Sequence, residues 1–172
     1  MEFIEEIEMK THTLLEFDFS DMNAVGDEFF IEQIKKEGII IYENVDFKYM
    51  DLKKAYDNLV EVSDLYDGKN DIVRDSLIQR FEFTYELTHK TLQEFMKYLG
   101  VTLENSFPRT IFKKAYVNNL ISDELVWISL LEDRNSTSHI YNEKLADEIA
   151  SRIVNKYVVA IGQLVENLEK LK

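Results

Sequence analysis

The chain has 172 residues, 45% of them hydrophobic and 31% charged, which predicts one folded domain with a sizeable core and excludes a disordered chain. Its net charge of −13 excludes non-specific binding of nucleic acid, because phosphates are repelled, so any RNA contact requires a local basic site or a partner. The sequence has no cysteine, which excludes disulfides and thiolate metal sites. It also lacks an apolar run of roughly 20 residues and a signal peptide, so we expect a cytoplasmic protein without a membrane segment.

Residues 1–44 are predicted to form a small β-α-β appendage. A strand is expected within residues 12–19, a helix over 27–38 and a short β-rich run over 38–43. Such a unit is too small to hold a core alone. We therefore expect it to pack on the rest of the chain or on another chain.

Residues 45–172 are predicted to form an all-α, antiparallel bundle of four or five helices. Apolar residues recur at intervals of three and four along five segments. These segments are centred on residues 52–66, cover 71–99, begin at Pro108, begin after Ser122 as an N-cap, and begin after Asn142. Gly100 is predicted to end the second helix, whereas Gly162 falls inside the last one, at a cost of about 1 kcal/mol relative to alanine.

The stretch EDRNSTSHIYNEK, residues 132–144, combines four side chains suited to work on a phosphate. His139 titrates near neutrality and can act as an acid or a base, and Arg134 offers a planar fork of donors that matches a phosphate. Asn135 can orient either group, and Tyr141 can bind the phosphate or present its hydroxyl for modification. The alternative is that both residues are structural: Arg134 would form an ion pair with Asp133, and His139 would donate a hydrogen bond to a carbonyl at the helix end.

The spacing of this motif predicts a break in the helix. Five residues on a continuous α-helix rotate by about 140°, so Arg134 and His139 would not share a face. Either the helix ends within Ser136–Ser138, or the site is completed across a dimer interface. We also expect few carboxylates around Arg134, because Glu132 and Asp133 project about 200° and 100° away from it.

Other polar and aromatic residues are candidates for binding the substrate. Arg80 and Tyr85 lie on the second predicted helix, and Lys90 and Arg109 could extend a rim for phosphates. The alternatives are a surface ion pair between Arg80 and Glu82, a core position for Tyr85, and solvated side chains for the two others. His89 is expected to be structural, and no cofactor or metal site is indicated.

The chain resembles the HEPN superfamily, and within it the nucleotidyltransferase substrate-binding proteins. The resemblance lies in LIQRFEFTYELTHKTLQEFMKYLG (77–100), ENSFPRTIFKKAY (104–116), LVWISLLEDRNSTSHIYNE (125–143) and the last helix. It implies a helical, usually dimeric protein that pairs with a minimal nucleotidyltransferase in a toxin–antitoxin-like system. It also implies a metal-independent RNase whose catalytic residues correspond to Arg134, Asn135, His139 and Tyr141, silenced in some pairs by AMP added to the tyrosine.

Residues 1–44 are similar to the last segment of such a transferase, but they lack the Gly-Ser loop and paired aspartates that hold its two metal ions. Leu15 falls where the third catalytic carboxylate would stand. Nucleotidyl transfer by this chain alone is therefore not expected. Three functions stay open: a latent RNase subunit, a non-catalytic module that binds a nucleotide or RNA, and a dimeric scaffold for the transferase.

Overall fold

The computed structural model describes residues 28–29, 32, 36, 41–137 and 142–171. Contacts within the chain divide it into two units, residues 1–39 and 40–172. In the first unit the four described residues are helical, within the segment predicted as a helix. The strand predicted within 12–19 lies outside the described residues.

The β-rich run predicted over 38–43 is wrong where it can be compared, because α3 begins at Ile41. Isoleucines favour strands, but strand propensity depends strongly on context. Here the segment continues into a helix whose buried Val45, Tyr49 and Leu52 follow a helical repeat. Packing of that face outweighs the local preference.

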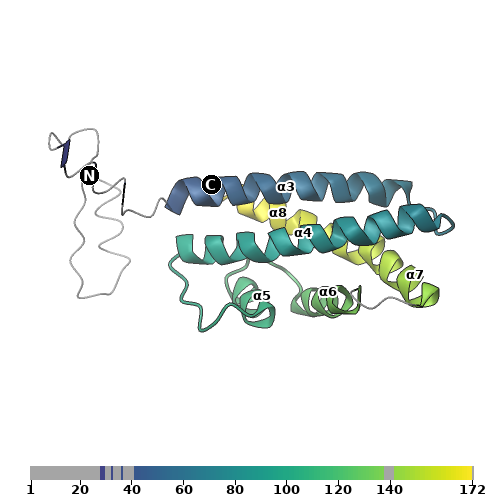
Figure 1. The fold of residues 1–172 in the computed structure, drawn as a ribbon. Coiled ribbons are helices and arrows are strands. Elements are labelled where there is room, and N and C mark those ends of the chain that lie inside the picture. The colour runs from purple at the N-terminus through teal and green to yellow at the C-terminus, as the bar shows by residue number, and fades with distance from the viewer. Residues whose placement is uncertain (1–27, 30–31, 33–35, 37–40, 138–141, 172) are drawn as a thin grey trace. The chain divides into compact units, whose positions relative to one another are not determined.

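The second unit is all-α, as predicted, and its described part contains no strand. Its elements are α3 (Ile41–Leu65), α4 (Asp71–Tyr98), α5 (Pro108–Val117), α6 (Glu124–Thr137), α7 (Glu143–Arg152), a π-helical turn η1 (Ile153–Tyr157) and α8 (Val158–Glu169). The two long helices α3 and α4 form an antiparallel hairpin, and α5 and α6 lie beside α4 (Figure 1). Helix α4 also contacts α7, so it is the central element of the bundle. No described helix is long and apolar enough to cross a bilayer.

Local signals explain where α4 begins and ends. The Asn70 side chain accepts hydrogen bonds from the amides of Ile72 and Val73, which caps the N-terminus. At the other end Gly100 has a φ of 68°, which a residue without a Cβ adopts at low cost. The Gly100 amide donates to the Lys97 carbonyl and the Val101 amide to the Met96 carbonyl, which completes a Schellman cap.

The predicted cap of α6 is wrong by one residue. The Asp123 carboxylate accepts from the amides of Leu125 and Val126, whereas the Ser122 hydroxyl donates to Gln163 on α8. Aspartate caps as well as serine and adds a negative charge at the positive end of the helix dipole. By contrast, Pro108 in the first turn of α5 and Asn142 as the cap of α7 are confirmed.

Aromatic rings join α4 to the elements around it. The ring of Phe81 stacks on Tyr157 of η1 with centroids 5.5 Å apart, and the ring of Tyr85 meets Phe112 of α5 at 6.2 Å. Phe112 in turn packs on Trp127 of α6 at 5.1 Å. These five side chains are all almost fully buried. The core therefore fixes the relative positions of α4 and α6, the two helices on which the predicted site depends.

Candidate functional site at the end of α6

The described part of α6 ends at Thr137, Asn142 is not helical, and α7 begins at Glu143, so the helix that carries Arg134 does not continue into α7. The end predicted within Ser136–Ser138 reaches Ser138, which lies outside the described residues. The Ser136 hydroxyl donates to the Glu132 carbonyl, and the Thr137 hydroxyl donates to the Arg134 carbonyl at 2.6 Å. Such bonds compete with the helical backbone pattern and suit a helix end. Two of the predicted catalytic residues, His139 and Tyr141, lie outside the described residues.

Arg134 is held by two residues of α4. Its Nη2 donates to Glu86 Oε1 at 2.6 Å, and its guanidinium carbon lies 5.6 Å from the centre of the Tyr85 ring. The side chain remains 34% exposed. One carboxylate that the sequence did not suggest is present, because the packing of α4 on α6 brings Glu86 to Arg134 from 48 residues away.

Asp133 is engaged on another face of α6, about 100° around the helix from Arg134. This buried carboxylate accepts from Arg152 Nε at 2.6 Å, from Arg152 Nη2 at 2.8 Å and from the Tyr157 hydroxyl at 2.5 Å. Burial, followed by the hydrogen bond to Asp133, raises the pKa of Tyr157 well above its usual range. The Asp133 partner is thus Arg152, and the network ties the end of α6 to α7 and η1.

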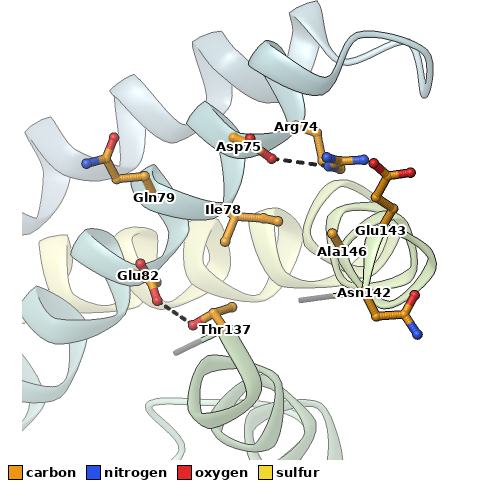
Figure 2. Close-up of a pocket in the computed structure, with 9 residues that line it drawn as sticks. All are labelled: Arg74, Asp75, Ile78, Gln79, Glu82, Thr137, Asn142, Glu143 and Ala146. Carbon is orange, nitrogen blue, oxygen red and sulfur yellow. Dashed lines mark hydrogen bonds and ion pairs between the residues drawn. The ribbon is translucent and has the colours of Figure 1, made fainter. Parts of the chain in front are cut away.

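Two open depressions border the same face of α4. The first, here called the Arg74 groove, has a volume of about 330 Å³. Its lining residues are Arg74, Asp75, Ile78, Gln79, Glu82, Thr137, Asn142, Glu143 and Ala146 (Figure 2). The second, here called the Arg134 groove, has a volume of about 640 Å³. Its lining residues are Ser76, Gln79, Arg80, Glu82, Phe83, Glu86 and Arg134.

The two grooves meet along α4, since Gln79 and Glu82 line both of them. In Figure 2 the Glu82 carboxylate extends from α4 toward Thr137, whose hydroxyl donates to it. Thr137 and Asn142, which line the Arg74 groove, are the described residues on either side of the segment that contains His139 and Tyr141. The described residues that flank this segment therefore both line the Arg74 groove.

The structure separates the other candidates by exposure and pairing. Arg80 and Lys90 are exposed, and neither pairs with a carboxylate among the described residues. The alternative of an Arg80–Glu82 ion pair is not observed, because Glu82 receives Thr137. Arg109 pairs with Glu132 at 3.0 Å on the surface, where both side chains are more than half exposed. Asn135 is exposed but lines neither groove.

Tyr85 and His89 lie deeper than the cationic candidates. Tyr85 is only 3% exposed, and burial raises its pKa to about 12. Its ring packs against the Arg134 guanidinium. His89 Nε2 lies 3.1 Å from the Ser106 carbonyl oxygen, which joins α4 to the loop before α5. Burial lowers the pKa of His89, as expected of a structural histidine.

Sequence reasoning missed four residues of the Arg134 groove, namely Ser76, Gln79, Phe83 and Glu86. They lie on the side of α4 away from the apolar stripe that identifies the helix. The signal was available, because Ser76, Gln79, Phe83 and Glu86 follow each other at intervals of three and four and so share one face. Within the described part of the chain, no three acidic or histidine side chains lie close enough together to hold a metal ion.

The sequence over residues 47–170 matches the family described as "Nucleotidyltransferase substrate binding protein like". The chain therefore belongs to this family, as the resemblance indicated. It is similar to a protein of Haemophilus influenzae named "Probable ribonuclease HepT", with 28% identity over 121 residues that cover 65% of this chain and 82% of that one.

Two solved structures have the same fold. A crystal structure from Thermus thermophilus has a TM-score of 0.63 and 29% identity, and the match covers 68% of this chain and 98% of that one. A Haemophilus influenzae structure, described as the fold of a substrate binding domain of a nucleotidyltransferase, has a TM-score of 0.55 and 24% identity over 74% of this chain and 98% of that one. The second likeness supports the fold alone.

Proposed function

We propose that this chain is the RNA- or nucleotide-binding partner subunit of a minimal nucleotidyltransferase, in a two-component system of the toxin–antitoxin kind. We further propose that its motif is a latent, metal-independent endoribonuclease site. The observation that carries the proposal is the position of Arg134, which lines an open groove of about 640 Å³ at the end of the helix that leads to His139. The name of the Haemophilus influenzae relative, a probable ribonuclease, supports the same reading.

The proposed chemistry divides between Arg134 and His139. His139 takes the proton of a ribose 2′-hydroxyl, the 2′-oxygen attacks the phosphorus, and the 5′-oxygen leaves with a proton, giving a cyclic phosphate and a free 5′-hydroxyl. Arg134 stabilises the charge that grows on the phosphoryl oxygens. Asn135 orients the phosphate or the histidine, and the Tyr141 hydroxyl binds the phosphate or accepts a modification.

The remaining candidates extend the site. Arg80 and Lys90 are exposed cations without a carboxylate partner among the described residues, so each is free to bind a backbone phosphate. Tyr85 contributes by supporting the Arg134 guanidinium. Arg109 first has to leave Glu132. Two copies of the chain are proposed to form a dimer that brings two motifs together, and residues 1–44 are proposed to be a remnant of a nucleotidyltransferase.

The test is an RNA-cleavage assay with the full chain in the presence of a metal chelator. We expect the wild type to cleave RNA and His139→Ala to be inactive with a nearly unchanged Tm. Arg134→Ala should lose more activity than Asn135→Ala, because a charged contact to phosphate is about twice as strong as a neutral one. His89→Gln is the matched control and should retain activity. Full activity of His139→Ala, or its unfolding, would show that the histidine is structural.

A non-catalytic binding module is the second candidate, and the Arg134–Glu86 ion pair favours it. A guanidinium already paired with a carboxylate at 2.6 Å stabilises the negative charge of a transition state less than a free one does. It still offers hydrogen-bond donors to a bound phosphate. If wild type binds RNA or nucleotide through Arg134 without cleaving it, the module is the correct reading. Light scattering on the same samples reports whether the chain is a dimer.

A further inference from the structure

Phe83 is an aromatic side chain that the fold itself does not use. It lies on α4 with 57% of its surface exposed, whereas the other rings in the middle of this helix, Phe81 and Tyr85, are buried. It is also the only aromatic residue among the described side chains that line either groove. Large exposed apolar surface is unfavourable in water and often marks a binding site.

Two arginines line the same groove as Phe83. Arg80 precedes it by three residues and Glu86 follows it by three, so each step along the helix axis is about 4.5 Å. Glu86 carries the guanidinium of Arg134, and Arg80 has no carboxylate partner in the part of the chain that the structure describes. The face of α4 thus presents a cation, an aromatic ring and a second cation in order, and Lys90 continues it.

The charge of the Arg134 groove also differs from that of the whole protein. Its lining contains Arg80 and Arg134 against Glu82 and Glu86, so its formal charge is zero in a chain of net charge −13. Both carboxylates are already engaged, Glu82 by the Thr137 hydroxyl and Glu86 by Arg134. A polyanion therefore meets less repulsion here than over the average surface, with Arg80 unpaired among the described residues and Arg134 sharing its charge with Glu86.

We infer that Phe83 is a stacking platform for one unpaired base, and that single-stranded RNA is the substrate class of the Arg134 groove. The inference rests on the proposed function and adds to it the form of the RNA and the residue that selects this form. Every base has a π face that stacks on an aromatic side chain, while phosphates on either side bind arginine. A base inside a duplex is paired and stacked already and cannot reach the ring. The Ser76 and Gln79 side chains supply hydrogen-bonding groups for the base edge.

The experiment measures binding of a labelled single-stranded oligoribonucleotide and of a duplex with the same sequence, by fluorescence anisotropy. All proteins carry His139→Ala so that the RNA stays intact. The variants are Phe83→Ala, Phe83→Trp, which keeps an aromatic face, and Phe47→Ala as a matched control. Phe47 is 67% exposed on α3 and lines neither groove.

We expect Phe83→Ala to raise the Kd for the single strand about five- to a hundredfold over that of the parent, which corresponds to the loss of one stacked base. Phe83→Trp should bind as well as the parent or better, and Phe47→Ala should be unchanged. The duplex should bind weakly to all four proteins and respond little to the change at Phe83.

Three results would overturn the inference. If the parent binds the single strand and Phe83→Ala binds it equally well, the ring is not a platform, and the proposed function still stands. Conversion of a dimer to a monomer by Phe83→Ala in light scattering would show that a second copy of the chain covers the ring instead. Absence of any RNA binding by the His139→Ala parent and by wild type would remove the proposed RNA function and the inference with it.

Discussion

Glu86 and Arg134, which lie 48 residues apart on α4 and α6, form an ion pair of 2.6 Å beside the Arg134 groove. The pair brings a negative charge to the residue that is proposed to bind a phosphate. It is partly open to water, with 34% of the arginine and 40% of the glutamate side chain exposed. An ion pair of this exposure contributes at most about 1 kcal/mol to stability. Its main effect is therefore on the charge that Arg134 offers to a ligand.

Glu86→Gln should increase the affinity for single-stranded RNA and make binding more dependent on salt. The amide oxygen still accepts a hydrogen bond from Arg134, but it no longer compensates the charge. Anisotropy titrations at low and high salt measure both effects, and the urea midpoint should change little. Glu148→Gln removes the same charge from an exposed position on α7, outside both grooves. An equal gain in this control would mean that only net charge matters.

Asp133→Asn should destabilise the fold by about 2–3 kcal/mol. The buried carboxylate accepts three hydrogen bonds, two of them from the Arg152 guanidinium, and an amide cannot accept all three equally well. Tyr157→Phe removes one donor and should cost about 1 kcal/mol. Urea unfolding followed by circular dichroism measures both. A loss for Asp133→Asn no larger than that for Tyr157→Phe would show that the arginine bonds contribute little.

Gly162→Ala should destabilise the protein although alanine favours helices. A Cβ at this position would lie 3.0 Å from Tyr56 Cζ and closer still to the hydroxyl, so the Tyr56 ring would have to leave its place between α3 and α8 or the two helices would have to separate. Overpacking of this kind costs about 1–3 kcal/mol. In a Tyr56→Ala background the same change should instead stabilise by up to about 1 kcal/mol, because the ordinary helix preference returns. A double-mutant cycle by thermal unfolding measures the coupling, and simple additivity would contradict this contact.

His89 should make the fold less stable as the pH falls from 7 to 5. Burial lowers its pKa in the folded chain below the unfolded value of about 6.5, so the unfolded state binds the proton more readily. Stability is therefore complete above that unfolded pKa and decreases as the pH drops toward the folded one. His89→Gln can still donate to the Ser106 carbonyl but does not titrate, so its Tm should vary less over this range. Equal slopes for the two proteins would contradict the prediction.

Much of the fold could be predicted because its boundaries depend on neighbouring residues. The cap Asn142, the positive φ of Gly100 and the first-turn Pro108 each act within one helical turn, and each was visible in the sequence. The strand propensity of residues 38–43 misled because the packing of later residues, beginning with Val45, decides the conformation of Ile41.

The site was less predictable, because its partners come from a distant helix. Nothing around Arg134 indicates that Glu86 faces it, and nothing around Asp133 indicates Arg152. Phe83 was passed over for a different reason. The apolar stripe that identifies α4 contains Phe81 and Tyr85. Phe83 lies two positions from each of them and therefore on another face of the helix. Patterns that identify a core thus draw attention away from the exposed aromatic residue.

The π-helical turn keeps four buried residues in line. Ile149, Ile153, Tyr157 and Ile161 are spaced by four each, and on a regular α-helix this repeat would drift by about 40° at every step. In η1 the Val158 amide donates to the Ile153 carbonyl, five residues back, so one additional residue is accommodated in the turn and the drift is offset. A relative without this turn should differ by a single-residue gap within Ile153–Tyr157, not by scattered substitutions. Deleting one residue there from this chain should convert the turn into regular α-helix and leave the apolar side of α8 on α3, because the turn holds the additional residue.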